Sequence, residues 1–181
     1  MIFDDTEIPG VKLIRHTPFS DDRGVFRRAF CADEFAQAGI VNAVAQSNIS
    51  ENFRAGTLRG FHYQEAPHGE GKTLTCVAGS VHDIVVDLRA DSPTYLKWQS
   101  FTLSSDNREA VHVPPGCANA FLTIEDNTTV VYFSSHPYTP AAERGIRFDD
   151  PLFEFDWPMT PELVSDKDRS HPDFQPRPLS S

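Results

Sequence analysis

Cysteine is scarce in this chain of 181 residues: the three thiols, Cys31, Cys76 and Cys117, are widely spaced and form no CxxC pair. An odd number without paired spacing argues against a disulfide framework and against a zinc site built from cysteine. The neighbours of all three are small or apolar, which is typical of buried, unreactive thiols. We therefore expect reduced, structural cysteines.

Long apolar runs are also missing. No stretch approaches the roughly 18 consecutive apolar residues that a membrane-spanning helix needs. The acidic first ten residues lack the positive start and the apolar centre of a secretion signal. There is no internal repeat, and the proline-rich final segment from His171 looks irregular. These absences predict a soluble, cytoplasmic protein without membrane association, and a length of 181 residues suits one domain, residues 1–181.

Basic residues are outnumbered by acidic ones in this chain. The chain has 16 Lys and Arg against 26 Asp and Glu, a net charge of −10. Long nucleic acids bind to broad basic faces, so we expect no nucleic-acid partner. A small anionic ligand can still bind where a few arginines converge.

What the chain does contain is many short, β-branched segments bounded by turns. Residue types alternate with a period near two in residues 80–89, and residues 72–77, 109–114 and 128–134 are similar. Residues 32–38 are the clearest helix candidate, which Gly39 ends after about two turns. The pattern predicts an all-β jelly-roll sandwich or barrel, a fold that can enclose a ligand, with helix as a minor component.

The densest group of chemically active side chains lies in LRGFHYQ, residues 58–64. Arg59 and His62 are three positions apart, so on a regular strand they point to opposite faces. They project together only if the strand bulges near Gly60. Taken alone, one His and one Arg on a strand are more often structural than catalytic.

Together with segments along most of the chain, LRGFHYQ resembles the dTDP-4-dehydrorhamnose 3,5-epimerase family. Many ordered matches at family-like spacing carry more weight than one short motif. The resemblance implies a cupin-type jelly-roll barrel with its core at about residues 45–150, flanked by an N-terminal strand and a C-terminal helical segment. It also implies a homodimer in which the N-terminal part of one subunit lies near the other's cavity. The other matching segments are DRG at 22–24, Phe26, Phe30, Gln46, Asn48, GK at 71–72, VVDLR at 85–89, DSPTY at 91–95, LS at 103–104, VPPG at 113–116, Tyr132, Tyr138, ERGIR at 143–147, DDP at 149–151, WP at 157–158 and SDKD at 165–168.

The activity implied is epimerisation beside the ketone of a nucleotide-diphosphate 4-keto sugar, which requires a base, a site for the enolate charge and an acid. By resemblance, His62 is the general base and Asp168 orients it. Lys72 stabilises the oxyanion at the C4 oxygen, and Tyr132 returns a proton from the opposite face. Without the resemblance, Lys72 would be interpreted as a surface lysine and Tyr132 as a core tyrosine.

The resemblance places substrate binding on further polar and aromatic side chains. Arg23 and Arg59 match pyrophosphate binders, because a guanidinium group can hold two oxygens at once. Without the resemblance, Arg23 would only neutralise its own acidic turn. The other implied contacts are Phe26 near the nucleotide base, Gln46 and Asn48 beside the diphosphate, and Tyr138 against the substrate.

Metal-binding cupins place two histidines close together in a first motif and another in a second motif. Here the first motif offers only His62, and the histidine position of the second motif holds Asn119. The other nearby histidines, His68, His82 and His112, are scattered. We expect no metal and no cofactor.

Asn119 is also a departure from the epimerase family, whose segment ends Gly-Phe-Ala-His-Gly-Phe where residues 116–121 read GCANAF. Asparagine cannot accept a proton at neutral pH, although it can hydrogen-bond a phosphate or a sugar hydroxyl. Inversion at C3 alone is therefore an alternative to inversion at both C3 and C5.

Arg28 is the second departure, because the family usually carries there a Glu that accepts a hydrogen bond from thymine N3–H. Arginine can only donate, which suits cytosine or guanine better than thymine. We expect a CDP- or GDP-linked sugar to be preferred over a dTDP-linked one.

Two other functions fit parts of the pattern. A cupin isomerase would shift the ketone between C3 and C4, and a binding module would keep the pocket without turnover. The complete set of His62, Lys72, Tyr132 and Asp168 favours an enzyme, since binding alone has no need for a matched acid and base.

Overall fold

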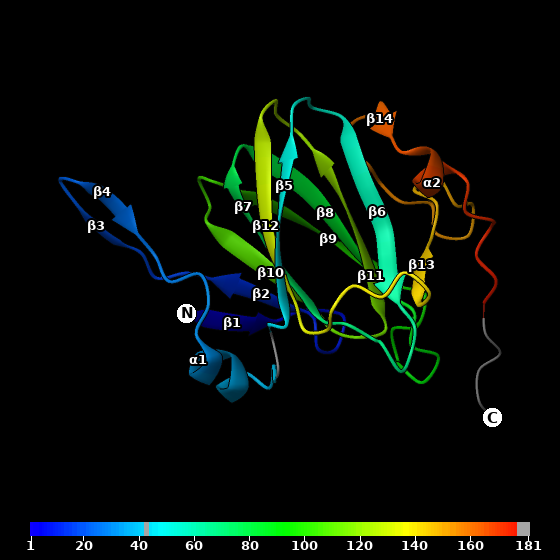
Figure 1. Cartoon of the computed structure of the whole chain (residues 1–181), viewed down its shortest axis with the longest axis horizontal. Coiled ribbons are helices and arrows are strands. Elements are labelled where there is room, and N and C mark those ends of the chain that lie inside the picture. The colour runs from blue at the N-terminus through cyan, green and yellow to red at the C-terminus, as the bar shows by residue number, and fades with distance from the viewer. Residues whose placement is uncertain (42–43, 177–181) are drawn as a thin grey trace.

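The computed structural model describes residues 1–41 and 44–176, and its architecture is two antiparallel sheets packed face to face (Figure 1). The all-β jelly roll expected from the sequence is confirmed, as are strands at the four segments identified by alternation. The first sheet has the order β1 (Ile2–Asp5), β2 (Lys12–Arg15), β10 (Glu109–Val113), β7 (Lys72–Ala78), β12 (Thr128–Ser134), β5 (Gln46–Asn52). The second has the order β13 (Glu143–Gly145), β6 (Thr57–Gln64), β11 (Cys117–Thr123), β8 (Ser80–Asp87), β9 (Trp98–Ser104), and β14 (Leu163–Val164) pairs in parallel with β6.

Strand β8 shows how the sequence specifies two apolar layers. Val81 and Val85 pack between the sheets in one hydrophobic cluster. Ile84 and Val86 point the opposite way into a second cluster, which the aromatic segment around Phe153 covers. A strand buried on both faces is apolar almost throughout, which explains the continuous run IVV. Asp83 therefore occupies an interior position between two core valines.

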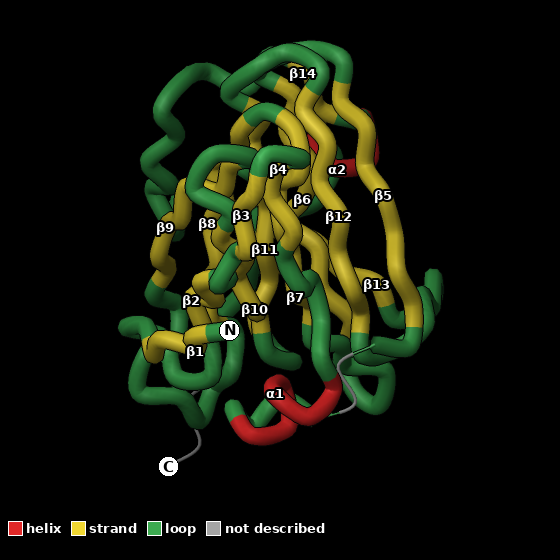
Figure 2. The backbone as a smooth tube through the Cα atoms, turned by 90° about the vertical axis from the view of Figure 1, so that its left-hand side faces the viewer, coloured by secondary structure: helices red, strands yellow, loops and turns green. Residues whose placement is uncertain are grey.

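The remaining elements lie outside the sandwich. Strands β3 (Phe19–Asp21) and β4 (Gly24–Phe26) form a hairpin, called here the arm, which projects away from the barrel (Figure 1). Helix α1 (Ala32–Gln37) lies at one end of the strands (Figure 2) and buries Phe35. Helix α2 (Asp166–Arg169) follows β14. None of the helices in the described part of the chain is long and apolar enough to cross a membrane.

The cysteines are free thiols, as expected. Cys76 and Cys117 belong to the cluster between the sheets. Burial raises the pKa of the Cys117 thiol to about 12 and that of Cys76 to about 11. Both are therefore protonated at neutral pH and serve as small core side chains.

Candidate active site

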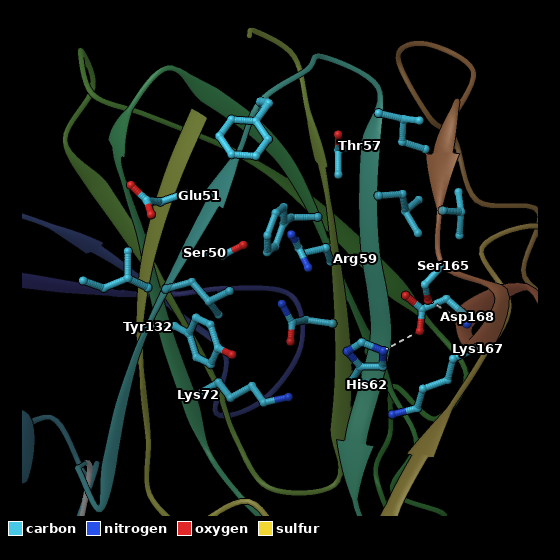
Figure 3. A pocket seen from close by; sticks show the side chains of 18 of the residues that line it. Ser50, Glu51, Thr57, Arg59, His62, Lys72, Tyr132, Ser165, Lys167 and Asp168 are labelled. Carbon is cyan, nitrogen blue, oxygen red and sulfur yellow. Dashed lines mark hydrogen bonds and ion pairs between the residues drawn. The ribbon is translucent and has the colours of Figure 1, made fainter. Parts of the chain in front are cut away.

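A cavity of about 850 Å³ opens between the two sheets, with α2 and β14 along one side (Figure 3). Its walls combine charged and apolar side chains, as in sites that bind a polar ligand in a defined orientation. The lining residues are Ile49, Ser50, Glu51, Phe53, Thr57, Leu58, Arg59, His62, Lys72, Leu74, Asn119, Phe121, Tyr132, Glu162, Leu163, Val164, Ser165, Lys167 and Asp168.

A bulge in β6 brings Arg59 and His62 to the same face. His62 pairs with Asn119 and Arg59 pairs with Phe121, so β6 has one residue more than β11 between these two pairs. At the bulge, Gly60 has a φ of +112°, and a Cβ there would lie 2.6 Å from the Asn119 carbonyl oxygen. Only glycine fits that approach. The conditional prediction from the sequence is confirmed, and both side chains line the cavity.

His62 and Asp168 form a hydrogen-bonded pair across 106 residues of sequence. The distance from His62 Nε2 to Asp168 Oδ1 is 2.7 Å. Helix α2 holds the carboxylate, since its N-cap Ser165 accepts from the Asp168 backbone N–H at 3.1 Å. Burial alone would raise the pKa of Asp168, but the hydrogen bond and charge of His62 outweigh it, so the pKa is lowered.

An ionised Asp168 makes the His62 Nε2–H the donor, so Nδ1 carries the free lone pair. The His62 ring extends into the cavity (Figure 3). This is the arrangement that a general base needs.

Lys72 and Tyr132 lie across the cavity from His62, on β7 and β12 (Figure 3). Lys72 Nζ is 3.0 Å from Glu70 Oε1. Burial, with a smaller contribution from the charge of Glu70, raises the pKa of Tyr132. The phenol is therefore protonated at neutral pH and able to donate. An imidazole with a free lone pair and a protonated phenol on opposite walls match the geometry that an inversion requires.

Among the predicted binding residues, Arg59 and Asn119 line this cavity. Arg59 Nε donates to Asn52 Oδ1 at 2.7 Å. On β5, Gln46 Nε2 donates a hydrogen bond to Asn48 Oδ1 at 2.9 Å. The Tyr138 backbone N–H donates to Gln46 Oε1 at 3.0 Å. Gln46, Asn48 and Tyr138 are close to one another but are not among the cavity-lining residues.

The three remaining predicted residues are on or beside the arm, away from the cavity. Arg23 is 88% exposed and pairs with Asp21 of its own turn. Phe26 is 74% exposed. Arg28 Nη1 donates to Glu34 Oε1 at 2.6 Å. The protomer alone therefore does not bring Arg23, Phe26 and Arg28 together with His62.

The sequence interpretation did not single out several charged residues, among them Lys167, Glu143 and Asp83. Lys167 lines the cavity, and its Nζ donates to Glu143, which also accepts from the Tyr138 hydroxyl at 2.7 Å. Asp83 is fully buried and accepts from Asn119 Nδ2 at 2.9 Å. An acidic residue at a core position of an apolar strand is the sequence signal that could have identified Asp83.

Within residues 1–41 and 44–176, no group of three His, Cys, Asp or Glu side chains is placed to hold a metal ion. His112 illustrates the scattered histidines: it is buried, and its Nδ1 is 2.9 Å from Thr73 Oγ1. Burial lowers its pKa to about 4, so it is a neutral packing residue.

Comparison with known proteins identifies relatives over nearly the whole chain. A family model described as dTDP-4-dehydrorhamnose 3,5-epimerase matches residues 5–176. The dTDP-4-dehydrorhamnose 3,5-epimerase of Sinorhizobium fredii is 38% identical over 181 residues, which cover 99% of this chain and 93% of that protein. The dTDP-4-dehydrorhamnose 3-epimerase of Streptomyces niveus is 41% identical over 163 residues, 90% of this chain and 78% of the relative. A crystal structure of the Bacillus anthracis 3,5-epimerase with TDP and PPi bound has a TM-score of 0.92 at 34% identity, and covers 96% of this chain and 99% of its own.

The fold, the cavity and these relatives define a cupin-type isomerase that epimerises a nucleotide-linked sugar. The ketoisomerase and the binding module are not favoured. The chain belongs to the dTDP-4-dehydrorhamnose 3,5-epimerase family.

Proposed function

We propose that this enzyme inverts a carbon beside the ketone of a nucleotide-diphosphate 4-keto sugar with His62 as base and Tyr132 as acid. The observation that carries the proposal is the 2.7 Å His62–Asp168 pair, which lies across the cavity from Tyr132 (Figure 3). The test is incubation with 4-keto sugar nucleotides in heavy water, followed by identification of the labelled carbons. Solvent deuterium at a carbon next to the ketone supports the proposal, and absence of label from every substrate offered contradicts it.

Each group has one step in the reaction. His62 Nδ1 takes the proton from the carbon, the C–H electrons form a double bond to C4, and the ketone becomes an enolate. The Lys72 ammonium stabilises the negative oxygen, as a preorganised charge does in a site with restricted water. Tyr132 then protonates the same carbon from the other face, which inverts it. Asp168 stabilises the imidazolium that His62 becomes.

The number of inverted centres is the next question. We propose inversion at C3 alone, because Asn119 replaces the histidine that the family places in this wall and cannot relay a proton. A relative of similar identity is named as a 3-epimerase. Label at C3 only supports this assignment, whereas label at both C3 and C5 means that Asn119 does not restrict the reaction.

Arg28 supports a CDP- or GDP-linked substrate. Its guanidinium has donors only, whereas the Glu usual at this position accepts from thymine N3–H. The Arg28–Glu34 ion pair fixes one face of the guanidinium and leaves other N–H groups for a base. Tight binding of a pyrimidine or purine base through Arg28 requires that the arm reach a cavity.

A homodimer supplies that contact. The arm extends away from its own barrel and exposes Phe19 and Phe26, with 62% and 74% of their surfaces accessible. Exposed aromatic side chains on a projecting hairpin favour a protein contact. We therefore propose that Arg23, Phe26 and Arg28 complete the cavity of a second copy. A dimeric mass by light scattering is expected at micromolar concentration, and a monomeric mass in the wild type contradicts the proposal.

We also propose that turnover is independent of metal, because the base, oxyanion site and acid are all supplied by side chains. Activity should survive dialysis against a chelator. Loss of activity that added zinc or manganese restores would overturn this proposal.

A further inference from the structure

Asp83 is a buried carboxylic acid at a position where the fold calls for an apolar side chain. It lies on the inner face of β8 between Val81 and Val85 and is 0% exposed. Its Oδ2 has no hydrogen-bond partner among the described residues. Burying an incompletely paired carboxyl group is unfavourable for stability. A residue that costs stability without packing or pairing well is a candidate for a functional role.

Within the described part of the chain, the Asp83 side chain makes one hydrogen bond, and its partner is a residue of the active site. Its Oδ1 accepts from Asn119 Nδ2 at 2.9 Å. Asn119 lines the cavity and is the cross-strand partner of His62 in the β6–β11 register. Asp83 thus contacts the side chain beside the proposed base without lining the cavity itself.

This hydrogen bond decides which end of the Asn119 amide is available to a ligand. Both amide hydrogens are on Nδ2, which is turned to Asp83, so the carbonyl Oδ1 is the end left for the cavity. A carbonyl oxygen accepts hydrogen bonds and cannot donate. It can therefore accept a hydrogen bond from a sugar hydroxyl. A ketone oxygen and a phosphate oxygen are acceptors too, so neither can donate a hydrogen bond to it.

We propose that Asp83 is a positioning residue: it holds Asn119 so that its carbonyl oxygen accepts a hydrogen bond from a ring hydroxyl of the sugar, next to the carbon that His62 deprotonates. The inference rests on the proposed epimerase function and names the part of the substrate that this wall recognises. It accounts for Asn119 in this chain, because an amide has one accepting and one donating end and needs a neighbour to select between them.

The charge state of Asp83 is compatible with this role. Burial raises its pKa to about 7, against the opposing effects of the Asn119 hydrogen bond and the charge of Lys72, which is itself paired with Glu70. A protonated carboxyl group still has one carbonyl oxygen that accepts from Asn119, so the arrangement does not need an ionised Asp83.

The test is a double-mutant cycle on Asp83 and Asn119. Asp83→Val removes the acceptor at a site flanked by valines and should lower kcat/KM by about tenfold to a hundredfold, as expected when a buried polar group loses its partner. Asn119→Ala should have a similar effect, and the double variant should be little worse than either single variant, because both disrupt the same contact. Multiplicative losses in the double variant would overturn the proposal.

Two further measurements separate positioning from a structural role. Asp83→Asn retains an accepting oxygen and should preserve most of the activity. Asp83→Val should unfold at a higher temperature than the wild type while being less active, whereas a merely structural Asp83 predicts lower stability. If Asp83→Asn is as inactive as Asp83→Val, or Asp83→Val is both unstable and fully active, the assignment is wrong.

The last test measures substrate recognition. Calorimetric titration should compare a CDP- or GDP-linked 4-keto sugar with analogues that lack the hydroxyl at C2 or at C3. The wild type should bind at least one analogue about tenfold more weakly, a preference that Asn119→Ala and Asp83→Val should lose. Turnover without this discrimination overturns the inference and leaves the epimerase function intact. Discrimination without turnover retains the inference and removes the epimerase function.

Discussion

The stability of the protein should depend on pH in a way that the Asp83→Asn substitution removes. Burial raises the pKa of Asp83 to about 7, from 3.8 for an unperturbed Asp. Between these values the folded protein keeps the proton and the unfolded chain loses it, so the folded state binds more protons. The contribution of Asp83 is therefore fully present below pH ~4 and is lost as the pH rises to about 7. The neutral asparagine has no such dependence.

The size of the effect follows from the shift. The pKa of Asp83 differs by about 3 units between the folded and unfolded states. At ~1.4 kcal/mol per unit, this difference lowers the free energy of unfolding by about 4 kcal/mol at pH 8 relative to low pH. Denaturant unfolding of the wild type and of Asp83→Asn from pH 4.5 to 8 should show a gap that grows with pH in favour of the variant. Asp106→Asn, a substitution in an exposed turn, is the matched control for the loss of one carboxylate. A gap between wild type and Asp83→Asn that stays constant over this range would refute the reasoning.

Three other substitutions or titrations address the site. Asp168→Asn should lower kcat by on the order of a hundredfold, because an amide cannot stabilise the imidazolium of His62; near-normal kcat would mean that the carboxylate is not needed. Tyr132→Phe should allow solvent deuterium to enter the substrate while product of inverted configuration falls sharply; inversion at the wild-type rate would assign the acid elsewhere. Calorimetric titration with CDP, GDP, UDP and dTDP should favour CDP or GDP by roughly tenfold to a hundredfold if Arg28 reads the base. Tightest binding of dTDP would contradict that interpretation.

Period-two alternation was enough to predict four strands of the barrel, β7, β8, β10 and β12, because side chains of a strand alternate between two environments. The same alternation predicted that Arg59 and His62 can share a face only if the strand bulges near Gly60. The register of β6 and β11 confirms this bulge. The alternation did not show which face of β8 lines the interior, because both faces are apolar. For that reason the alternation did not reveal that Asp83 lies inside the barrel beside Asn119, a residue of the cavity wall.

No local sequence pattern could predict contacts between residues that lie far apart in the chain. His62 and Asp168 are 106 positions apart, and only the family resemblance related them before the structure placed them 2.7 Å apart. The resemblance was less informative for Arg23 and Arg28. Both make ion pairs within their own N-terminal segment, with Asp21 and Glu34, because the arm does not fold back onto its own barrel. A single protomer cannot bring these residues to a substrate.

Proton exchange by the His62→Ala variant tests the central claim most directly. Wild type and variant would be incubated with the 4-keto sugar nucleotide in heavy water, and deuterium at each ring carbon would be followed over time. The wild type should incorporate label beside the ketone, and His62→Ala should slow this exchange by about a hundredfold to ten-thousandfold while binding the nucleotide almost unchanged. Exchange by His62→Ala at close to the wild-type rate would contradict the assignment of His62 as the base.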